Sequence, residues 1–212
     1  TYESLQKGVV DGTIGPIDVV LQLRDAGIPV VFVDTDPSLA GPAQLAQQVA
    51  DALGAPAAGT ALGEELTAGI DAKVAEIAAV LPSAAPLRIM FLYLRGTSGI
   101  YYLFGEEAGA DALITALGGV DVAAELGIPD SRPLTDEAVV AADPDLILVM
   151  TEGLASVGGV DGLLESKPAI GLTTAGQNRR FVDMADGQVL GFGPRTAAVL
   201  DALARAIYAP GQ

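Results

Sequence analysis

The sequence has 212 residues, half of them apolar, which is enough to bury a core in one large domain or two small ones. Acidic residues outnumber basic ones by 27 to 11, and the net charge of −16 argues against nucleic-acid and anionic-membrane partners, because phosphates attract Lys and Arg. Cys and His are both absent, which excludes disulfides, thiolate metal sites, triads that need His and the common zinc sites.

Residues 1–56 predict part of a layered α/β lobe. The opening TYESLQKGVV has no Met and no targeting segment, so we expect a fragment or a processed chain. GPIDVVLQLRDAG has helical apolar spacing, IPVVFVD predicts a short buried strand, and SLAGPAQLAQQVADALG predicts a second helix that ends at Gly54. The strands that would pair with VVFVD are missing from this chain, so this first lobe is expected to be partial.

Residues 57–82 predict a long helix that links two parts of the chain. Apolar residues recur at three- and four-residue steps through GTALGEELTAGIDAKVAEIAAVLP, and Pro82 closes the pattern. The segment PSAAP then breaks the chain. No apolar run in the sequence approaches transmembrane length.

Residues 83–212 predict a complete second α/β lobe. Strands are expected in LRIMFLYL, DLILVM and RRFVDM, a short extended piece in IYYLFG, and helices in EEAGADALITALGG, TDEAVVAA, VDGLLESKPAI and GPRTAAVLDALARAIYA. Thr135 is placed to cap one of these helices. Strands that alternate with helices predict a central, mostly parallel sheet flanked by helices on both faces.

The strand in FLYLRGTSG ends with a phenol and a guanidinium. Tyr93 and Arg95 have the same parity, so a strand that continues to Arg95 would place both side chains on one face of the sheet. From these residues alone, a half-buried packing tyrosine with an arginine that solvates the strand edge is the simpler interpretation, and a binding site is the alternative.

Three motifs, in this order, resemble one class of proteins over nearly the whole chain. GPIDVVLQLRDAGIPVVFVD is similar to the end of the first lobe of the helical-hinge substrate-binding proteins of ABC transporters. TDEAVVAADPDLILVM resembles their helix, Asp-Pro-Asp turn and buried strand, and GFGPRTAAVLDALARAIY resembles their closing helix. FLYLRGTSGIYYLFG is similar to the haem-binding branch of this class, the HmuT-type lipoproteins.

The resemblance implies a haem site at Tyr93. In the haem-binding branch a tyrosine at this position is an axial ligand to the iron and an arginine two residues later hydrogen-bonds the phenolate, which implies Tyr93 as metal ligand and Arg95 as its partner. A histidine from the first lobe supplies the other ligand in those proteins, and this chain has none. A phenolate suits ferric iron, and a nearby cation that never deprotonates favours the phenolate.

Other residues are assigned with the same resemblance in mind. Tyr101 and Tyr102 either line the cleft, where Tyr102 would contact the porphyrin, or pack in the core. Met184 could offer its thioether sulfur to the haem iron, although Met more often fills gaps in the core. Glu165 and Glu107 are candidates for pairing with Arg on the ABC permease.

The expected function is therefore the extracytoplasmic haem-binding component of a bacterial haem-import ABC transporter, without enzymatic activity. The intact protein is expected at the outer face of the cell membrane, lipid-anchored, with haem, the permease and haem-donor surface proteins as partners. The partial first lobe also predicts a homodimer of this chain. A ferric-siderophore or cobalamin carrier of the same fold is the alternative. A doubly wound enzyme is disfavoured, because no phosphate-binding Gly-rich motif follows a strand.

Overall fold

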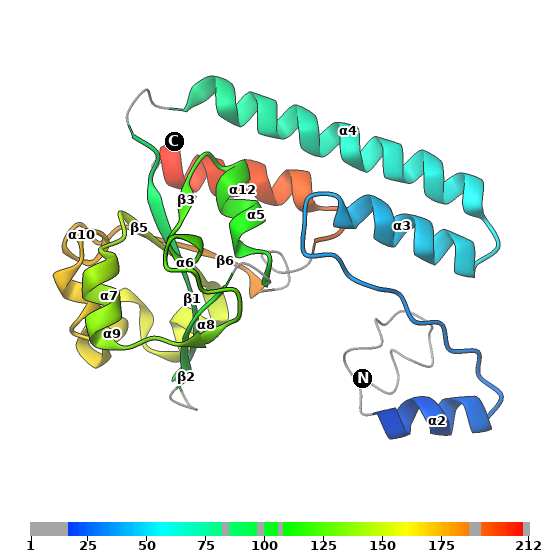
Figure 1. Cartoon of the computed structure of the whole chain (residues 1–212), viewed down its shortest axis with the longest axis horizontal. Helices are drawn as coiled ribbons and strands as arrows, with labels where there is room; N and C mark the ends of the chain where they lie inside the picture. The colour runs from blue at the N-terminus through cyan, green and yellow to red at the C-terminus, as the bar shows by residue number, and fades with distance from the viewer. Residues whose placement is uncertain (1–16, 82–84, 97–99, 106–107, 187–191, 210–212) are drawn as a thin grey trace.

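The computed structural model describes residues 17–81, 85–96, 100–105, 108–186 and 192–209 (Figure 1). Its helices flank a mixed sheet, and a pair of long helices extends away from that sheet. The helices are α2 (Ile17–Asp25), α3 (Gly41–Ala52), α4 (Pro56–Val80), α5 (Ala110–Ala116), α6 (Val122–Glu125), α7 (Asp136–Ala142), α8 (Thr151–Ser156), α9 (Gly159–Ser166), the 3-10 helix η3 (Ile170–Leu172), α10 (Thr174–Gln177) and α12 (Thr196–Tyr208).

The sheet has its longest strand at the centre. The strands are β1 (Arg88–Arg95), β2 (Ile100–Leu103), β3 (Val120–Asp121), β4 (Arg132–Pro133), β5 (Leu146–Met150) and β6 (Phe181–Met184). Their order is β4-β2-β1-β5-β6, and β3 also pairs with β1. The pairs β1–β5, β5–β6 and β1–β3 are parallel, whereas β2 returns antiparallel to β1 and β4 is antiparallel to β2. The predicted fold class, a mostly parallel sheet flanked by helices, is confirmed.

Strand β1 divides its apolar residues between two cores, one on each face of the sheet. Ile89 and Phe91 pack with buried residues of α4, α5 and α12 on one face. Met90, Leu92 and Leu94 pack on the other face with buried residues of α6, α7, α9 and α10. Because successive side chains of a strand point to opposite faces, the apolar middle of this strand is covered on both sides, as parallel sheets require.

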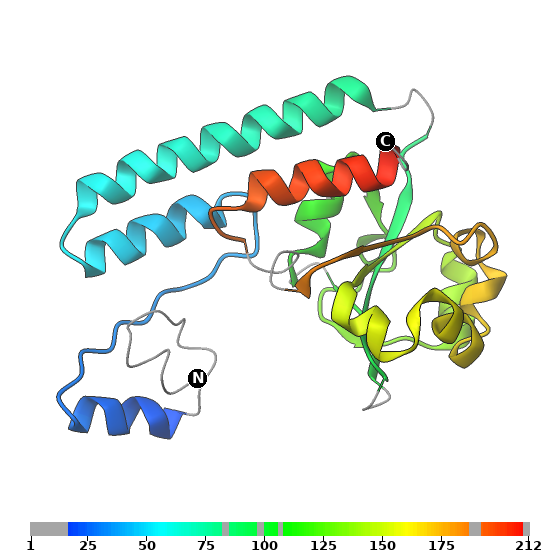
Figure 2. The same ribbon diagram turned by 180° about the vertical axis from the view of Figure 1, so that it is seen from behind.

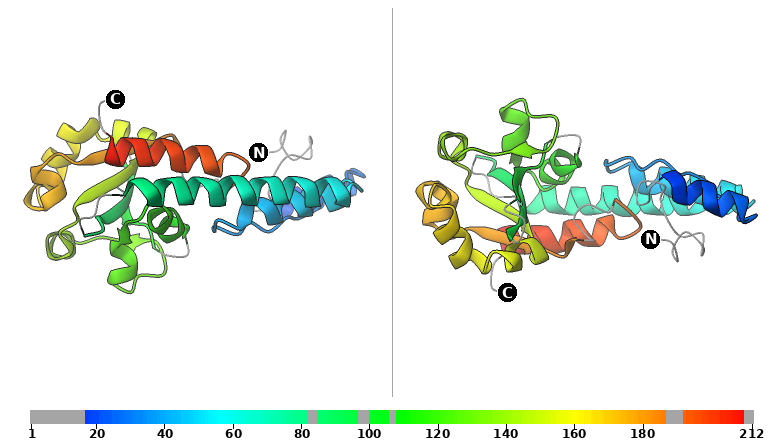
Figure 3. Two further views of the ribbon diagram at one scale, coloured as in Figure 1. Left: turned by 90° about the horizontal axis from the view of Figure 1, so that it is seen from above. Right: turned by 90° about the horizontal axis from the view of Figure 1, so that it is seen from below.

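The long helix α4 is shared by two neighbours. Its second half lies beside α12, and its first half extends beyond the sheet and pairs with α3 (Figures 2 and 3). Glycines at 59 and 63 are buried, and a side chain at 59 would come within 2.6 Å of the Ala50 methyl group on α3. Ile70 and Ile77, by contrast, are buried in the core of the sheet domain. Small residues therefore form one interface of α4 and large apolar residues form the other.

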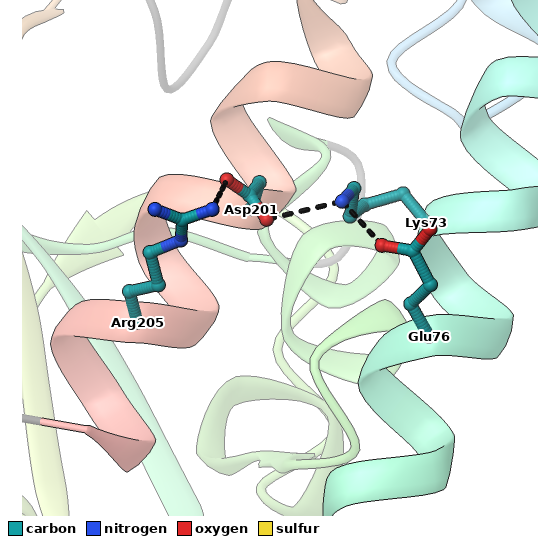
Figure 4. A network of polar contacts seen from close by, with 4 residues as sticks. All are labelled: Lys73, Glu76, Asp201 and Arg205. Carbon is teal, nitrogen blue, oxygen red and sulfur yellow. Dashed lines mark hydrogen bonds and ion pairs between the residues drawn. The ribbon is translucent and has the colours of Figure 1, made fainter.

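A polar network joins α4 to α12 on their shared side (Figure 4). The Lys73 ammonium donates to Glu76 on its own helix and, at 3.1 Å, to Asp201 on α12. Asp201 also pairs with Arg205 one turn later, at 2.9 Å. Hydrogen bonds to Glu76 and Asp201 raise the pKa of Lys73, so it stays charged throughout the physiological range.

The predicted strand in IPVVFVD does not form. Residues 28–37 have no regular secondary structure, and Val31 and Phe32 are half-exposed. Within the part of the chain that the structure describes, no strand lies beside this segment to accept its backbone hydrogen bonds. A segment of β-forming residues needs a partner strand to form backbone hydrogen bonds. Without that pairing, its apolar side chains are not held against a core and stay exposed.

Candidate functional site

Three tyrosines lie near the carboxyl end of β1, on two faces of the sheet. Tyr93 and Arg95 share β1 and a face, and the register pairs Tyr93 with Tyr102 on β2. Tyr101 pairs with Leu94, so it belongs to the opposite face, where it is buried in the second core. Tyr93 and Tyr102 are only half-buried. The structure therefore brings Tyr93, Arg95 and Tyr102 together and separates Tyr101 from them.

The ring of Tyr93 lies between an aromatic side chain and a cation. Its centroid is 5.4 Å from that of Phe104, with the two planes tilted by 52°. The Arg95 guanidinium carbon lies 5.9 Å from the Tyr93 centroid, within the range of a cation–π contact. Among the contacts of the described residues, none is a hydrogen bond from Arg95 to the Tyr93 hydroxyl. In the structure the arginine faces the phenol ring, whereas the resemblance implied a bond to the phenol oxygen.

A hollow of about 390 Å³ opens beside Tyr93 and Arg95, and Leu94, Glu152, Gly153, Ser156 and Asp186 complete its lining. Glu152 follows the end of β5 by two residues, and Asp186 follows the end of β6 by two residues. The hollow therefore lies at the carboxyl ends of three neighbouring parallel strands, which is where open α/β sheets bind their ligands.

Hydrogen bonds between loops fix the walls of this hollow. The Gly96 backbone N–H donates to the Ser156 hydroxyl at 2.9 Å, which ties the end of β1 to α8. The Thr151 hydroxyl donates to Asp183 at 2.7 Å, and the Glu152 backbone N–H donates to Asp186 at 3.2 Å, which ties α8 to β6. A side chain at Gly96 would lie 2.3 Å from the Ser156 carbonyl oxygen, so the close approach of α8 requires glycine there.

The remaining predicted residues lie elsewhere. Met184 is buried in the first core, which is the packing role that its residue type favours. Glu165 is exposed on α9, and Glu107 lies outside the described residues. Within the described ranges no group of three His, Cys, Asp or Glu side chains could hold a metal ion, and no helix is long and apolar enough to cross a membrane.

Sequence reasoning missed three residues around Tyr93. Glu152 and Asp186 could have been found, because each follows a predicted strand that runs parallel to β1, and such strand ends meet at one edge of the sheet. Phe104 has the same parity as Tyr102 on an antiparallel return. Its contact with Tyr93 depends on the β1–β2 register, which the intervening loop sequence does not determine.

Comparisons with known proteins agree with this architecture. The periplasmic binding protein family model matches residues 16–186. The haem-binding protein RhuT from Roseiflexus sp. RS-1, in apo form, is 40% identical, with a TM-score of 0.85, over 95% of this chain and 75% of that chain. The haem-binding protein HmuT is 40% identical, with a TM-score of 0.86, over 94% of this chain and 64% of that chain. The chain thus spans about two thirds to three quarters of their lengths.

A third solved structure, the haem-binding protein BhuT with two haems, is 32% identical, with a TM-score of 0.82, over 93% of this chain and 73% of that chain. Comparison with curated sequences found no match. The resemblance that the sequence motifs indicated is confirmed by the family model and by relatives at 40% identity. On its sequence, its fold and these relatives, the chain belongs to the periplasmic binding protein family.

Proposed function

We propose that this chain is the haem-binding component of a bacterial haem-import ABC transporter and that ferric haem binds through the oxygen of Tyr93. The observation that carries the proposal is the half-buried phenol at the carboxyl end of β1, beside a hollow of about 390 Å³ and a guanidinium. Its support from relatives is that RhuT and HmuT, at 40% identity, are haem-binding proteins.

The residues around Tyr93 fit a ferric porphyrin. A phenolate is a hard, anionic ligand that suits Fe(III), and tyrosine is a known axial ligand to haem. Phe104 provides an apolar surface next to the ring, and Arg95 places a permanent cation there. Tyr102, directly across the strand pair from Tyr93, is placed to contact the porphyrin. Transport needs only capture and release, so the proposal includes no catalytic step.

Variants of HmuT point to the same pair of residue types. Its solved structures include one with a tyrosine replaced by alanine and one with an arginine, two positions later, replaced by alanine. Tyr93 and Arg95 have this spacing. In a ferric-siderophore or cobalamin carrier, the alternative of the same fold, Tyr93 would have no iron–phenolate bond.

Replacement of Tyr93 by Phe tests the ligand directly. The substitution removes the oxygen and keeps the ring, so the contact with Phe104 survives. Resonance Raman spectra of the chain with ferric haem should show an iron–phenolate band that Tyr93→Phe abolishes and the matched control Tyr102→Phe retains. Identical ferric spectra of the parent and Tyr93→Phe would refute the assignment.

The remaining assignments concern the intact protein. We propose a lipid anchor at the outer face of the membrane, haem-donor surface proteins as suppliers, and contact with the permease through exposed acidic residues. Glu165 is the described candidate, since it is exposed on α9. Glu165→Arg should reduce transport by membranes that contain the permease while haem binding stays unchanged. Equal transport by both proteins would remove Glu165 from the contact.

A further inference from the structure

We propose that Phe104 is a positioning residue that fixes the ring of Tyr93 in the orientation needed to bind iron. The inference rests on the proposed function for the identity of the ligand, and on the described contacts for everything else. A phenol oxygen can bind iron only along certain directions, so the plane and tilt of the ring decide how well the bond forms.

The tyrosine side chain does not fix this plane by itself. Rotation about the bond that joins an aromatic ring to its Cβ is broad and roughly two-fold, unlike the three sharp wells of aliphatic side chains. Tyr93 is half-buried near a strand end, so its ring is not enclosed by neighbours on every side. Neighbouring side chains must therefore hold it.

Among the described residues, Phe104 is the aromatic side chain whose ring contacts that of Tyr93. Its backbone N–H donates to the Phe91 carbonyl oxygen at 3.0 Å, which places it opposite Phe91 and on the same face as Tyr93. Its ring centroid lies 4.8 Å from that of Phe91, with planes tilted by 60°, and 5.4 Å from that of Tyr93, with planes tilted by 52°. Both are the tilted geometries that aromatic pairs prefer.

Phe104 is itself well anchored. Phe91, on its inner side, is fully buried in the core and cannot move without disturbing it. Gly105, the next residue, is buried, and a side chain there would lie 2.2 Å from the Pro129 carbonyl oxygen. Phe104 is therefore held by its ring contact with Phe91 and by the close packing of the backbone at the next residue. Phe104 thus connects the buried ring of Phe91 to the ring of Tyr93 beside the hollow and restricts the motion of the latter.

The contribution of Arg95 differs from that of Phe104. The guanidinium is exposed and lies 5.9 Å from the Tyr93 ring centroid, on a long side chain with several rotatable bonds. Arg95 can act on the charge of the phenol, but an exposed flexible group is a poor support for its orientation. Orientation and charge are thus controlled by different residues, and the two can be separated by mutation.

The experiment compares Phe104→Leu, Phe104→Tyr and Phe181→Leu in the full chain. Phe181 is also half-buried but packs on the second core, so Phe181→Leu controls for the general loss of an aromatic ring. Haem loss is followed by transfer to excess apomyoglobin, and the iron–phenolate band by resonance Raman. Phe104→Leu should broaden the band and speed haem loss by about three- to tenfold, the range expected for one aromatic pair. Phe104→Tyr should restore both, and Phe181→Leu should match the parent.

A second measurement needs no haem. With 3-fluorotyrosine incorporated, the ¹⁹F signal of Tyr93 is identified by its disappearance in Tyr93→Phe, and Phe104→Leu should shift and narrow it as the ring gains freedom. An unchanged ¹⁹F signal in Phe104→Leu, or an unchanged band and haem-loss rate, would overturn the inference. A parent without any iron–phenolate band would instead refute the proposed function. Folding of each variant is checked by urea unfolding.

Discussion

At the scale of single residues, Arg95 is placed to influence how acid releases the ligand. The proposed bond to iron needs the phenolate, and protons displace iron from it as the pH falls. A guanidinium whose carbon lies 5.9 Å from the ring centroid places a permanent positive charge beside the proposed bond. Solvent screens this exposed cation, so its effect is modest.

Arg95→Ala should therefore leave haem bound at pH 7 but release it at a higher pH than the parent. Absorbance of the ferric complex during acid titration measures this midpoint. Arg95→Lys, which keeps the charge, is the matched control, and its midpoint of release should lie between those of the parent and Arg95→Ala. Superimposed release curves for the parent and Arg95→Ala would show that the cation has no part in holding the phenolate.

Tyr101, on the opposite face of the sheet, affects the stability of the fold at alkaline pH. Its hydroxyl is buried, and no group among the described residues hydrogen-bonds it. Burial, with a smaller contribution from Asp136, raises the pKa of Tyr101 well above its ordinary value. A tyrosine in the unfolded chain loses its proton near pH 10. Above that pH only the unfolded chain loses the Tyr101 proton, which lowers the free energy of unfolding. The contribution of the neutral Tyr101 to stability is therefore complete below pH 10 and is lost as the pH rises further.

Tyr101→Phe should increase the free energy of unfolding at pH 7 by about 1 kcal/mol, because it removes a buried polar group without a partner. It should also make the decline of stability above pH 10 less steep. Tyr208 contributes to the same decline, since burial raises its pKa too, so some alkaline dependence will remain. Urea unfolding at pH 7, 9 and 11 provides both comparisons. A variant less stable than the parent at pH 7 would mean that the Tyr101 hydroxyl makes a stabilising hydrogen bond.

At the scale of elements, α4 is the segment whose two halves perform different tasks. Ile77 is 3% exposed and packs in the core of the sheet domain, whereas Leu62, on the half that pairs with α3, is 43% exposed. Ile77→Ala should lower the free energy of unfolding by about 2–4 kcal/mol, because it leaves a cavity in a packed core. Leu62→Ala should lower it by less than about 1 kcal/mol. Equal losses in urea unfolding would mean that α4 is not anchored through its second half.

The elements also show why sequence reasoning succeeded in some places and failed in others. Thr135 caps α7 as expected, through a bond that depends only on neighbouring residues. Strand β5 could be predicted because LILVM is apolar throughout and lies in a sheet covered on both faces. VVFV had the same local signal and formed no strand, since pairing depends on distant residues. The contact between Tyr93 and Phe104 likewise needed the register of two strands.

At the scale of the whole molecule, the chain exposes apolar side chains before α3. Leu21, Val31 and Phe32 are each at least half-exposed, although the same chain buries a full core around its sheet. Exposed apolar residues of this size favour association. We therefore expect a homodimer at high concentration.

Light scattering at increasing concentrations measures this association. The parent should move from monomer towards dimer mass, and Phe32→Ser should shift the transition to higher concentration. Leu172→Ser provides the control, since Leu172 is 65% exposed but lies on the sheet domain. A parent that stays monomeric throughout, or equal effects of the two substitutions, would contradict association through the segment that contains Phe32.

The central position of β1 has a kinetic consequence. Residues Ile89–Leu92 are fully buried and each pairs with β5, so their amide protons belong to the part of a protein that exchanges with solvent only on global opening. Tyr93 continues the same strand. Tyr93 lies beyond the last pair with β5 and, among the described strands, is held by β2 alone, so this end of β1 opens more easily than its buried middle. Under the proposed function, haem would therefore leave from the strand end while the core beneath it stays closed.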